Sequence, residues 1–163
     1  LVQSGSNLGY AGGNNVGIKR ALEYGCTHIC VLNNDTVVEL SELHKLADYL
    51  DADTSCAFVG PVLVENNGVG QTVQSAGASI NLWTGDVSVC SGGAPRGSLS
   101  GSFPCDYIGG ACIMFRAGDV DELGLSAISS SLRRQSGAFG PSAWVVRLFA
   151  VRMPPSFTRA RLL

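Results

Sequence analysis

A polar segment follows an apolar run in the first third of the chain. The run is His28–Leu32, and Asn33, Asn34, Asp35 and Thr36 come directly after it. A carboxylate at the end of a buried strand can hold Mg²⁺ or Mn²⁺, which can in turn neutralise a diphosphate leaving group. The amides of Asn33 and Asn34 could bind sugar or ribose hydroxyls. An Asp that only caps a turn would give the same local pattern, so both interpretations stay open at this point.

A second polar segment precedes this run. Residues 7–17 read NLGYAGGNNVG and contain four Gly and three Asn. Glycine lets backbone N–H groups approach a ligand closely, and a helix N-terminus that follows favours an anion. The segment lacks the GK[ST] of a P-loop and is not a GxGxxG fingerprint behind a first strand. A ligand-binding loop and a plain turn before a helix both fit it.

The elements that must position these segments follow from hydrophobic spacing. After an opening loop, a helix is expected from Asn15 to Tyr24, with Gly25 ending it. The stretch 27–35 is typical of a buried parallel strand, which would place its polar end at the carboxyl edge of a sheet. A second helix is expected with Ser41 as its N-cap and apolar residues at helical spacing through Leu50.

The hydrophobic spacing is less regular from residue 56 onward. Residues 56–65 predict a strand interrupted by Pro61, and residues 66–104 predict hairpin-like strands and loops. Residues 105–116 predict a strand pair, or one strand broken at Gly109-Gly110, and a short acidic helix is expected over Ala117–Leu123. The alternation of helices and strands predicts an α/β fold.

Together the two polar segments resemble bacterial glycosyltransferase family 2, particularly its rhamnosyltransferase-like members. The family pattern is N-x-G-[FY]-[AG]-x-G-N-N-x-G, then a helix and a strand that ends in LNPDT or LNNDT. A later match is DYIGGACIMFRAGDVDELG, similar to D-x-x-x-G-A-x-x-x-x-R followed by a helix. The resemblance covers residues 1 to about 125, and the matching positions are Asn7, Gly9, Tyr10, Ala11, Gly13, Asn14, Asn15, Gly17, Leu32, Asn33, Asp35, Thr36, Asp106, Gly110, Ala111 and Arg116.

The resemblance implies a GT-A fold, a Rossmann-like mixed sheet with flanking helices, here incomplete at both ends. It implies an inverting transfer of a sugar, with rhamnose as one candidate, from a nucleotide-diphospho-sugar to a glycan or lipid-linked acceptor. Asp35 would hold the divalent metal, Mg²⁺ or Mn²⁺, although Asn33 stands where a DxD motif has its first Asp. The implied donor-binding residues are Asn7, Gly9, Asn14, Asn15, Asn33, Asp35, Gly110 and Ala111, and Arg116 is interpreted as structural.

Two parts of the family pattern are missing. The family's first strand and its D-N-x-S-x-D-G-[ST] segment would precede Leu1, so we interpret the chain as a fragment. The acids that follow DELG in the family, one of them the expected general base, have no counterpart after Leu125, so no catalytic residue is assigned. We therefore expect a partial GT-A domain over residues 1–124.

The charge distribution divides at the same place. Residues 1–124 hold all 13 acids against five Lys or Arg, a balance of −8, whereas residues 125–163 hold six Arg and no acid. We interpret 125–163 as an atypical basic tail, either disordered or translated out of frame, because a shift of one base permits F-S-D-I-F-F over residues 126–131, close to the family's LF-x-x-x-FF. The rival is a genuine basic tail that binds nucleic acid or anionic lipid, for which the residues give little support.

Composition excludes several classes. With 45% hydrophobic and 15% charged residues, the chain is expected to be globular, and no apolar run is long enough to span a bilayer. The six Cys form no CxxC pair, which favours reduced, buried thiols in a cytoplasmic protein over a disulfide framework. His28 and His44 are expected to have structural or solvent roles, and Trp83 and Trp144 are expected to be packing residues rather than sugar-stacking platforms.

The expected partners follow from the resemblance. They are the nucleotide-sugar donor and the acceptor, with no nucleic acid, and a full-length protein would associate peripherally with the inner face of the membrane. Two other functions remain open from the residues alone. One is a sugar nucleotidyltransferase, which activates sugars, and the other is a non-catalytic nucleotide-binding domain.

Overall fold

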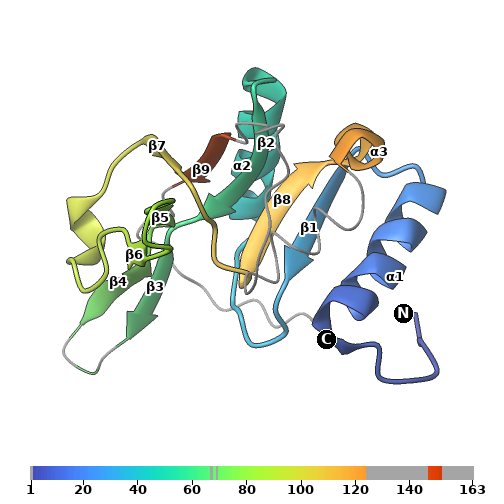
Figure 1. Ribbon diagram of the computed structural model, residues 1–163, viewed down its shortest axis with the longest axis horizontal. Helices are drawn as coiled ribbons and strands as arrows, with labels where there is room; N and C mark the ends of the chain where they lie inside the picture. Colours follow the sequence, from blue (N-terminus) through green and yellow to red (C-terminus); the bar gives the residue numbers. More distant parts are fainter. Residues whose placement is uncertain (1, 67, 69, 124–146, 152–163) are drawn as a thin grey trace.

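The computed structural model describes residues 2–66, 68, 70–123 and 147–151, and within these ranges the chain has a mixed α/β fold (Figure 1). The elements in chain order are α1 Gly9–Glu23, β1 His28–Leu32, α2 Leu40–Ala52, β2 Cys56–Pro61, β3 Leu63–Asn66, β4 Gln71–Ser75, β5 Ala78–Ile80, β6 Val87–Val89, the 3₁₀ turn η1 Arg96–Ser98, β7 Ser102–Cys105, β8 Cys112–Arg116, the 3₁₀ turn η2 Ala117–Asp119, α3 Val120–Leu123 and β9 Arg147–Val151.

The main sheet has five strands in the order β1-β8-β2-β9-β7. β8 runs antiparallel to both β1 and β2, and β9 is parallel to β2 but antiparallel to β7. The sheet is therefore mixed. Because β1 and β8 run in opposite directions, the end of β1 and the start of β8 lie at the same edge of the sheet, where α1 begins (Figure 1).

The two faces of this sheet carry separate apolar clusters. Ile29 and Val31 of β1 alternate with Cys30 and Leu32, as the period of a strand requires. The first pair packs with Ile113 and Phe115 of β8 and Ile18 of α1. The second pair faces the side where Leu46 and Leu50 of α2 pack. α1 and α2 thus cover opposite faces of the sheet.

The remaining strands form two small hairpins, β3–β4 and β5–β6, beside the main sheet (Figure 1). Val62, Val73 and Ala76 make a third apolar cluster beneath them. β5 is tied to the segment before β8, because the Ala78 N–H donates to Tyr107 O at 2.8 Å and the Tyr107 N–H to Ala78 O at 3.1 Å. The hairpin therefore supports the segment that leads to Gly110 and Ala111.

The opening segment differs most from its prediction. It was expected to be a loop with the helix starting at Asn15, whereas α1 begins at Gly9 and includes most of NLGYAGGNNVG. Ile18 is buried, and Ala21 and Leu22 pack against the same cluster. Burial of this face stabilises the helix more than its glycines weaken it, since tertiary packing usually outweighs propensity.

Other predicted boundaries also need correction. The N-cap of α2 is Glu39, not Ser41, and it makes no side-chain capping bond. β1 was expected to be a parallel strand, but its neighbour among the described strands is the antiparallel β8. The break near Pro61 is confirmed, because β2 ends at Pro61 and β3 starts at Leu63.

Two expectations about side chains, the packing of Trp83 and the burial of the thiols, are not met in full. Trp83 was expected to pack, yet it is 98% exposed at the turn between β5 and β6, so that prediction is wrong. All six Cys are free thiols; Cys56, Cys105 and Cys112 are buried, Cys30 and Cys90 are partly buried, and Cys26 is exposed. Burial of every thiol is therefore not observed.

Most of the predicted tail, 125–163, lies outside the described residues. Trp144 also lies outside them. Within the tail the structure describes β9, and the origin of the tail stays a prediction. No helix in the described ranges is both long enough and apolar enough to cross a membrane.

Candidate functional site

Tyr10 joins the three segments that the sequence singled out. Its hydroxyl lies 2.8 Å from the carbonyl oxygen of Gly110 and 3.3 Å from Oδ1 of Asn33. A phenol has one proton to donate, and the shorter distance favours Gly110 as its acceptor. The first turn of α1 is thereby linked to the end of β1 and to the start of β8, across sequence separations of 23 and 100 residues.

Backbone and side-chain hydrogen bonds hold the segment after β1 to Ala111, the residue before β8. The Asn33 N–H donates to Ala111 O at 2.9 Å, and the Thr36 hydroxyl lies 3.4 Å from the same oxygen. The Thr36 N–H donates to Asn33 O at 3.1 Å, which closes a β-turn. Asn34 and Asp35 occupy the two central positions of this turn and are exposed. Asp35 therefore projects from a firmly held turn beside Asn33.

The start of α1 has an unusual cap. The N-cap residue is Leu8, which makes no side-chain bond, and Oδ1 of Asn7 instead accepts the Gly9 N–H at 2.9 Å. Gly9 has φ +67°, a left-handed conformation in which glycine is favoured. The first turn carries no acidic residue. Asn7 thus stabilises the backbone turn that immediately precedes Tyr10.

Asn14 lies one turn after Tyr10 on the same face of α1. Its Nδ2 is buried and has no acceptor with hydrogen-bond geometry among the described residues. Burial raises the pKa of Tyr10, the nearby Asn14 amide lowers it by a smaller amount, and Tyr107 raises it further. The net effect raises the pKa of Tyr10, which is the direction that favours the protonated, donating phenol.

The structure brings some predicted site residues together and leaves others apart. Asn33, Gly110 and Ala111 meet around Tyr10, with Asn14 beside them. Asn7 and Gly9 are exposed at the beginning of α1, and Asn15 is partly buried on the same helix. Among the described residues, no hydrogen bond joins Asn7, Gly9 or Asp35 to Asn33, Gly110 or Ala111. Their roles in donor binding stay predictions.

The residues present fit only a sparse metal site. Asp35 is exposed, and no group of three or more His, Cys, Asp or Glu that could hold a metal occurs in the described part of the chain. Mg²⁺ is commonly bound through one or two carboxylates, with water and substrate phosphates completing its shell. Asp35 could serve in that way if a diphosphate supplied further ligands, and the Asn33 amide oxygen is already directed at Tyr10.

Asp106 and Arg116 of the later motif act on the scaffold. The carboxylate of Asp106 accepts the Ile80 N–H at 3.0 Å, which holds β5 to the segment before β8. The Arg116 guanidinium donates to Leu50 O at 2.5 Å and Cys56 O at 2.6 Å. It also pairs with Asp119 at 3.0 Å. Arg116 thus caps the end of α2, and its interpretation as structural is confirmed.

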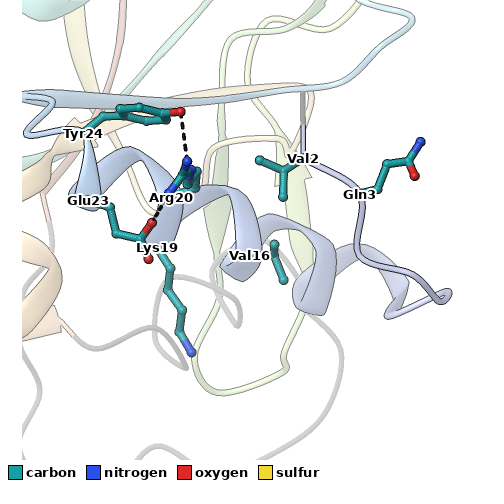
Figure 2. A pocket seen from close by; sticks show the side chains of 7 residues that line it. All are labelled: Val2, Gln3, Val16, Lys19, Arg20, Glu23 and Tyr24. Atoms are coloured by element: carbon teal, nitrogen blue, oxygen red, sulfur yellow. Dashed lines mark hydrogen bonds and ion pairs between the residues drawn. The ribbon is translucent and has the colours of Figure 1, made fainter.

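A surface groove lies elsewhere on α1. It has a volume of about 590 Å³ and is lined by Val2, Gln3, Val16, Lys19, Arg20, Glu23 and Tyr24 (Figure 2). The lining residues within α1, which are Val16, Lys19, Arg20 and Glu23, lie opposite the face that carries Tyr10, Asn14 and Ile18. Arg20 bonds Glu23 at 2.6 Å and lies 4.5 Å from the centre of the Tyr24 ring. The groove contains none of the predicted site residues.

The central residue of the site was not among the predicted donor-binding residues. Tyr10 was noticed only as part of the motif, because residues 7–14 were expected to be a loop. Had helical spacing been applied there, Tyr10, Asn14, Ile18 and Ala21 would have fallen on one face.

Comparison with known proteins adds no assignment, since no family model, curated protein or solved structure matches the chain.

Proposed function

We propose that the chain is part of an inverting glycosyltransferase that uses a nucleotide-diphospho-sugar, with rhamnose as one candidate sugar and a glycan or lipid-linked molecule as acceptor. The observation that supports this proposal is the meeting of three distant motif segments at one edge of the sheet. There the Tyr10 hydroxyl donates to the Gly110 carbonyl at 2.8 Å and lies 3.3 Å from the Asn33 amide oxygen. Asp35 lies on the exposed turn that follows Asn33.

The fold is compatible with this proposal at a coarse level. A GT-A domain is expected to have a mixed sheet with flanking helices, and the five-stranded sheet is mixed and is covered by α1 and α2. Many α/β proteins satisfy the same description, so the motif contacts rather than the sheet support the assignment.

Each part of the site has a defined role in the proposal. Asp35 binds Mg²⁺ or Mn²⁺, which would neutralise charge on the diphosphate leaving group. Asn33 and the 110–111 segment form the wall beside the sugar, and Tyr10 holds that wall to α1. Because this wall is fixed before the donor arrives, it can orient the donor without a large ordering cost. No general base is assigned within the described residues.

Donor binding can be tested by thermal unfolding. The 163-residue chain is heated with Mn²⁺ and a panel of nucleotide-diphospho-sugars, and far-UV circular dichroism first verifies that it is folded. Ligand at about 100 times Kd stabilises a folded protein by about 2.7 kcal/mol. For a chain of this size that corresponds to a rise in Tm of about 5–10 °C. We expect such a rise with one or more donors, and only with the metal present.

Variants identify the residues responsible. Asp35→Ala is expected to abolish the metal-dependent part of the rise. Asp121→Ala removes another exposed acid, which lies just after the far end of β8, and it is expected to leave the rise unchanged. Tyr10→Phe is expected to reduce the rise, because the wall at Gly110 is no longer held to α1.

The alternative functions give different results in the same experiments. Stabilisation by a sugar phosphate with a nucleoside triphosphate, and formation of nucleotide-sugar, would indicate a nucleotidyltransferase. Binding of donor without sugar transfer by the full-length protein would indicate a non-catalytic nucleotide-binding domain. Absence of any shift in a folded chain, or an unchanged shift in Asp35→Ala, would refute the proposed site.

A further inference from the structure

Two cysteines lie directly behind the candidate site, between β1 and β8. The Sγ atoms of Cys30 and Cys112 are 3.8 Å apart. In the antiparallel register Leu32 is opposite Cys112 and Cys30 is opposite Met114. The two thiols are therefore diagonal neighbours on one face of the sheet. Cys112 directly follows Ala111, whose carbonyl accepts the Asn33 N–H at 2.9 Å.

The surroundings of the two thiols differ. Cys112 is 1% exposed, whereas Cys30 is only partly buried, so a small reagent reaches Cys30 first. The hydrogen bond from Cys112 lowers the pKa of Cys30, and the same contact together with burial raises the pKa of Cys112. The more accessible sulfur is therefore also the one that forms a thiolate more readily, which suits an attacking thiol beside a resolving thiol.

We propose that Cys30 and Cys112 are an oxidation site that forms a reversible disulfide with hydrogen peroxide. The Cys30 thiolate attacks one peroxide oxygen and becomes a sulfenic acid, while the other oxygen leaves as hydroxide and takes up a proton to give water. The Cys112 sulfur then attacks the Cys30 sulfur, and the sulfenic oxygen leaves as a second water. The two thiols lose two protons and two electrons, which convert the peroxide to two waters.

Closure of this bond acts on the neighbouring site. A disulfide requires its sulfurs to lie about 2.05 Å apart, so the pair must close from its present 3.8 Å. Diagonal neighbours have Cα atoms about 7–8 Å apart, beyond the usual span of a disulfide, so closure also requires the backbones of β1 and β8 to shift. The shift falls one residue away from Ala111 and three away from Asn33. The oxidation state of the pair is thereby coupled to the edge of the sheet where Tyr10 is bound. This inference does not depend on the proposed function.

The experiment is thiol mapping on the folded 163-residue chain. Reduced protein is treated with hydrogen peroxide, the remaining thiols are alkylated in denaturant, and peptides are analysed by mass spectrometry without reduction. We expect two of the six thiols to be lost and a cross-link that dithiothreitol reverses. Trypsin gives peptides 21–45 and 97–116, which also contain Cys26 and Cys105 respectively, so fragmentation of the cross-linked pair is needed to locate the bond.

Variants separate the roles of the thiols. Cys26→Ser removes the exposed thiol that shares a peptide with Cys30, and it is expected to retain the cross-link in full. Cys30→Ser is expected to abolish the cross-link. Cys112→Ala is expected to leave a sulfenic acid on Cys30 that dimedone captures; the wild-type mapping does not depend on whether this buried variant folds.

Three results would overturn the proposal. The first is conversion of Cys30 to sulfinic or sulfonic acid in the folded wild type without a cross-link to Cys112. The second is a different cross-link, such as Cys26 to Cys105, as the main product. The third is a Cys30–Cys112 bond that forms no faster in the folded chain than in urea, which would remove the contribution of the fold.

Discussion

Replacing a glycine of α1 with alanine is expected to stabilise the fold at some positions of the helix and to destabilise it at others. Gly13 and Gly17 are exposed, and a Cβ built at either position meets nothing within 4 Å in the described structure. Glycine in a helix interior is about 0.8–1.0 kcal/mol less favourable than alanine. Gly13→Ala and Gly17→Ala should therefore each stabilise the fold by about 1 kcal/mol.

Gly9 and Gly12 in the first two turns behave differently. Gly9 has φ +67°, where an L-residue such as alanine costs about 1–2 kcal/mol, so Gly9→Ala should destabilise the fold by about that amount. A Cβ at Gly12 would lie 2.8 Å from the Leu8 Cβ, so the chain before the helix would have to shift. Gly12→Ala should therefore gain less than Gly13→Ala.

Urea unfolding followed by far-UV circular dichroism measures these differences. The shift in midpoint at unchanged m reports the change in the free energy of unfolding. If Gly13→Ala or Gly17→Ala destabilised the chain, the helix would not extend over these residues as the structure has it. A neutral Gly9→Ala would likewise contradict the left-handed start of α1. Destabilisation by Gly13→Ala would return residues 9–14 to the loop that their glycine content predicted.

Two further predictions concern the scaffold and pH. Arg116→Met should lower the free energy of unfolding by about 2–4 kcal/mol, because the carbonyls of Leu50 and Cys56 lose a charged donor. Arg116→Lys should lower it less, because one donor remains. Equal urea midpoints for wild type and Arg116→Met would contradict the capping role. Burial raises the pKa of Cys56 to about 11 from 9.0, so this thiol contributes stability that is fully present below pH 9 and is lost as pH rises toward 11. Urea midpoints from pH 8 to 11 should fall less steeply for Cys56→Ala than for wild type, and equal slopes would contradict the prediction.

Local pattern was enough to find most elements around the site. The apolar run at 28–32 became β1, and the helical spacing of Leu43, Leu46 and Leu50 became α2. The break at Pro61 and the structural role of Arg116 were also predictable. These features depend on the alternation or periodicity of side chains and on proline chemistry, which are properties of short segments.

Other features of the structure run against local residue preferences. Glycine-rich residues 9–14 favour a loop by propensity, but the helix includes them because Ile18 and its neighbours bury one face of α1. An exposed Trp83 contradicts the usual preference of large aromatic side chains for the interior. Its exposure depends on which side of the β5–β6 hairpin meets the rest of the chain, and that is not encoded in local spacing.

The sequence by itself determined which residue types are available for the proposed chemistry and placed a carboxylate, Asp35, just after a strand. The tertiary structure alone decided which of these residues meet. Tyr10 reaches Gly110 across 100 residues because α1 covers one face of a sheet in which β8, an antiparallel strand, lies next to β1. Such contacts arise from the summed burial of distant apolar side chains, and no local pattern contains that sum.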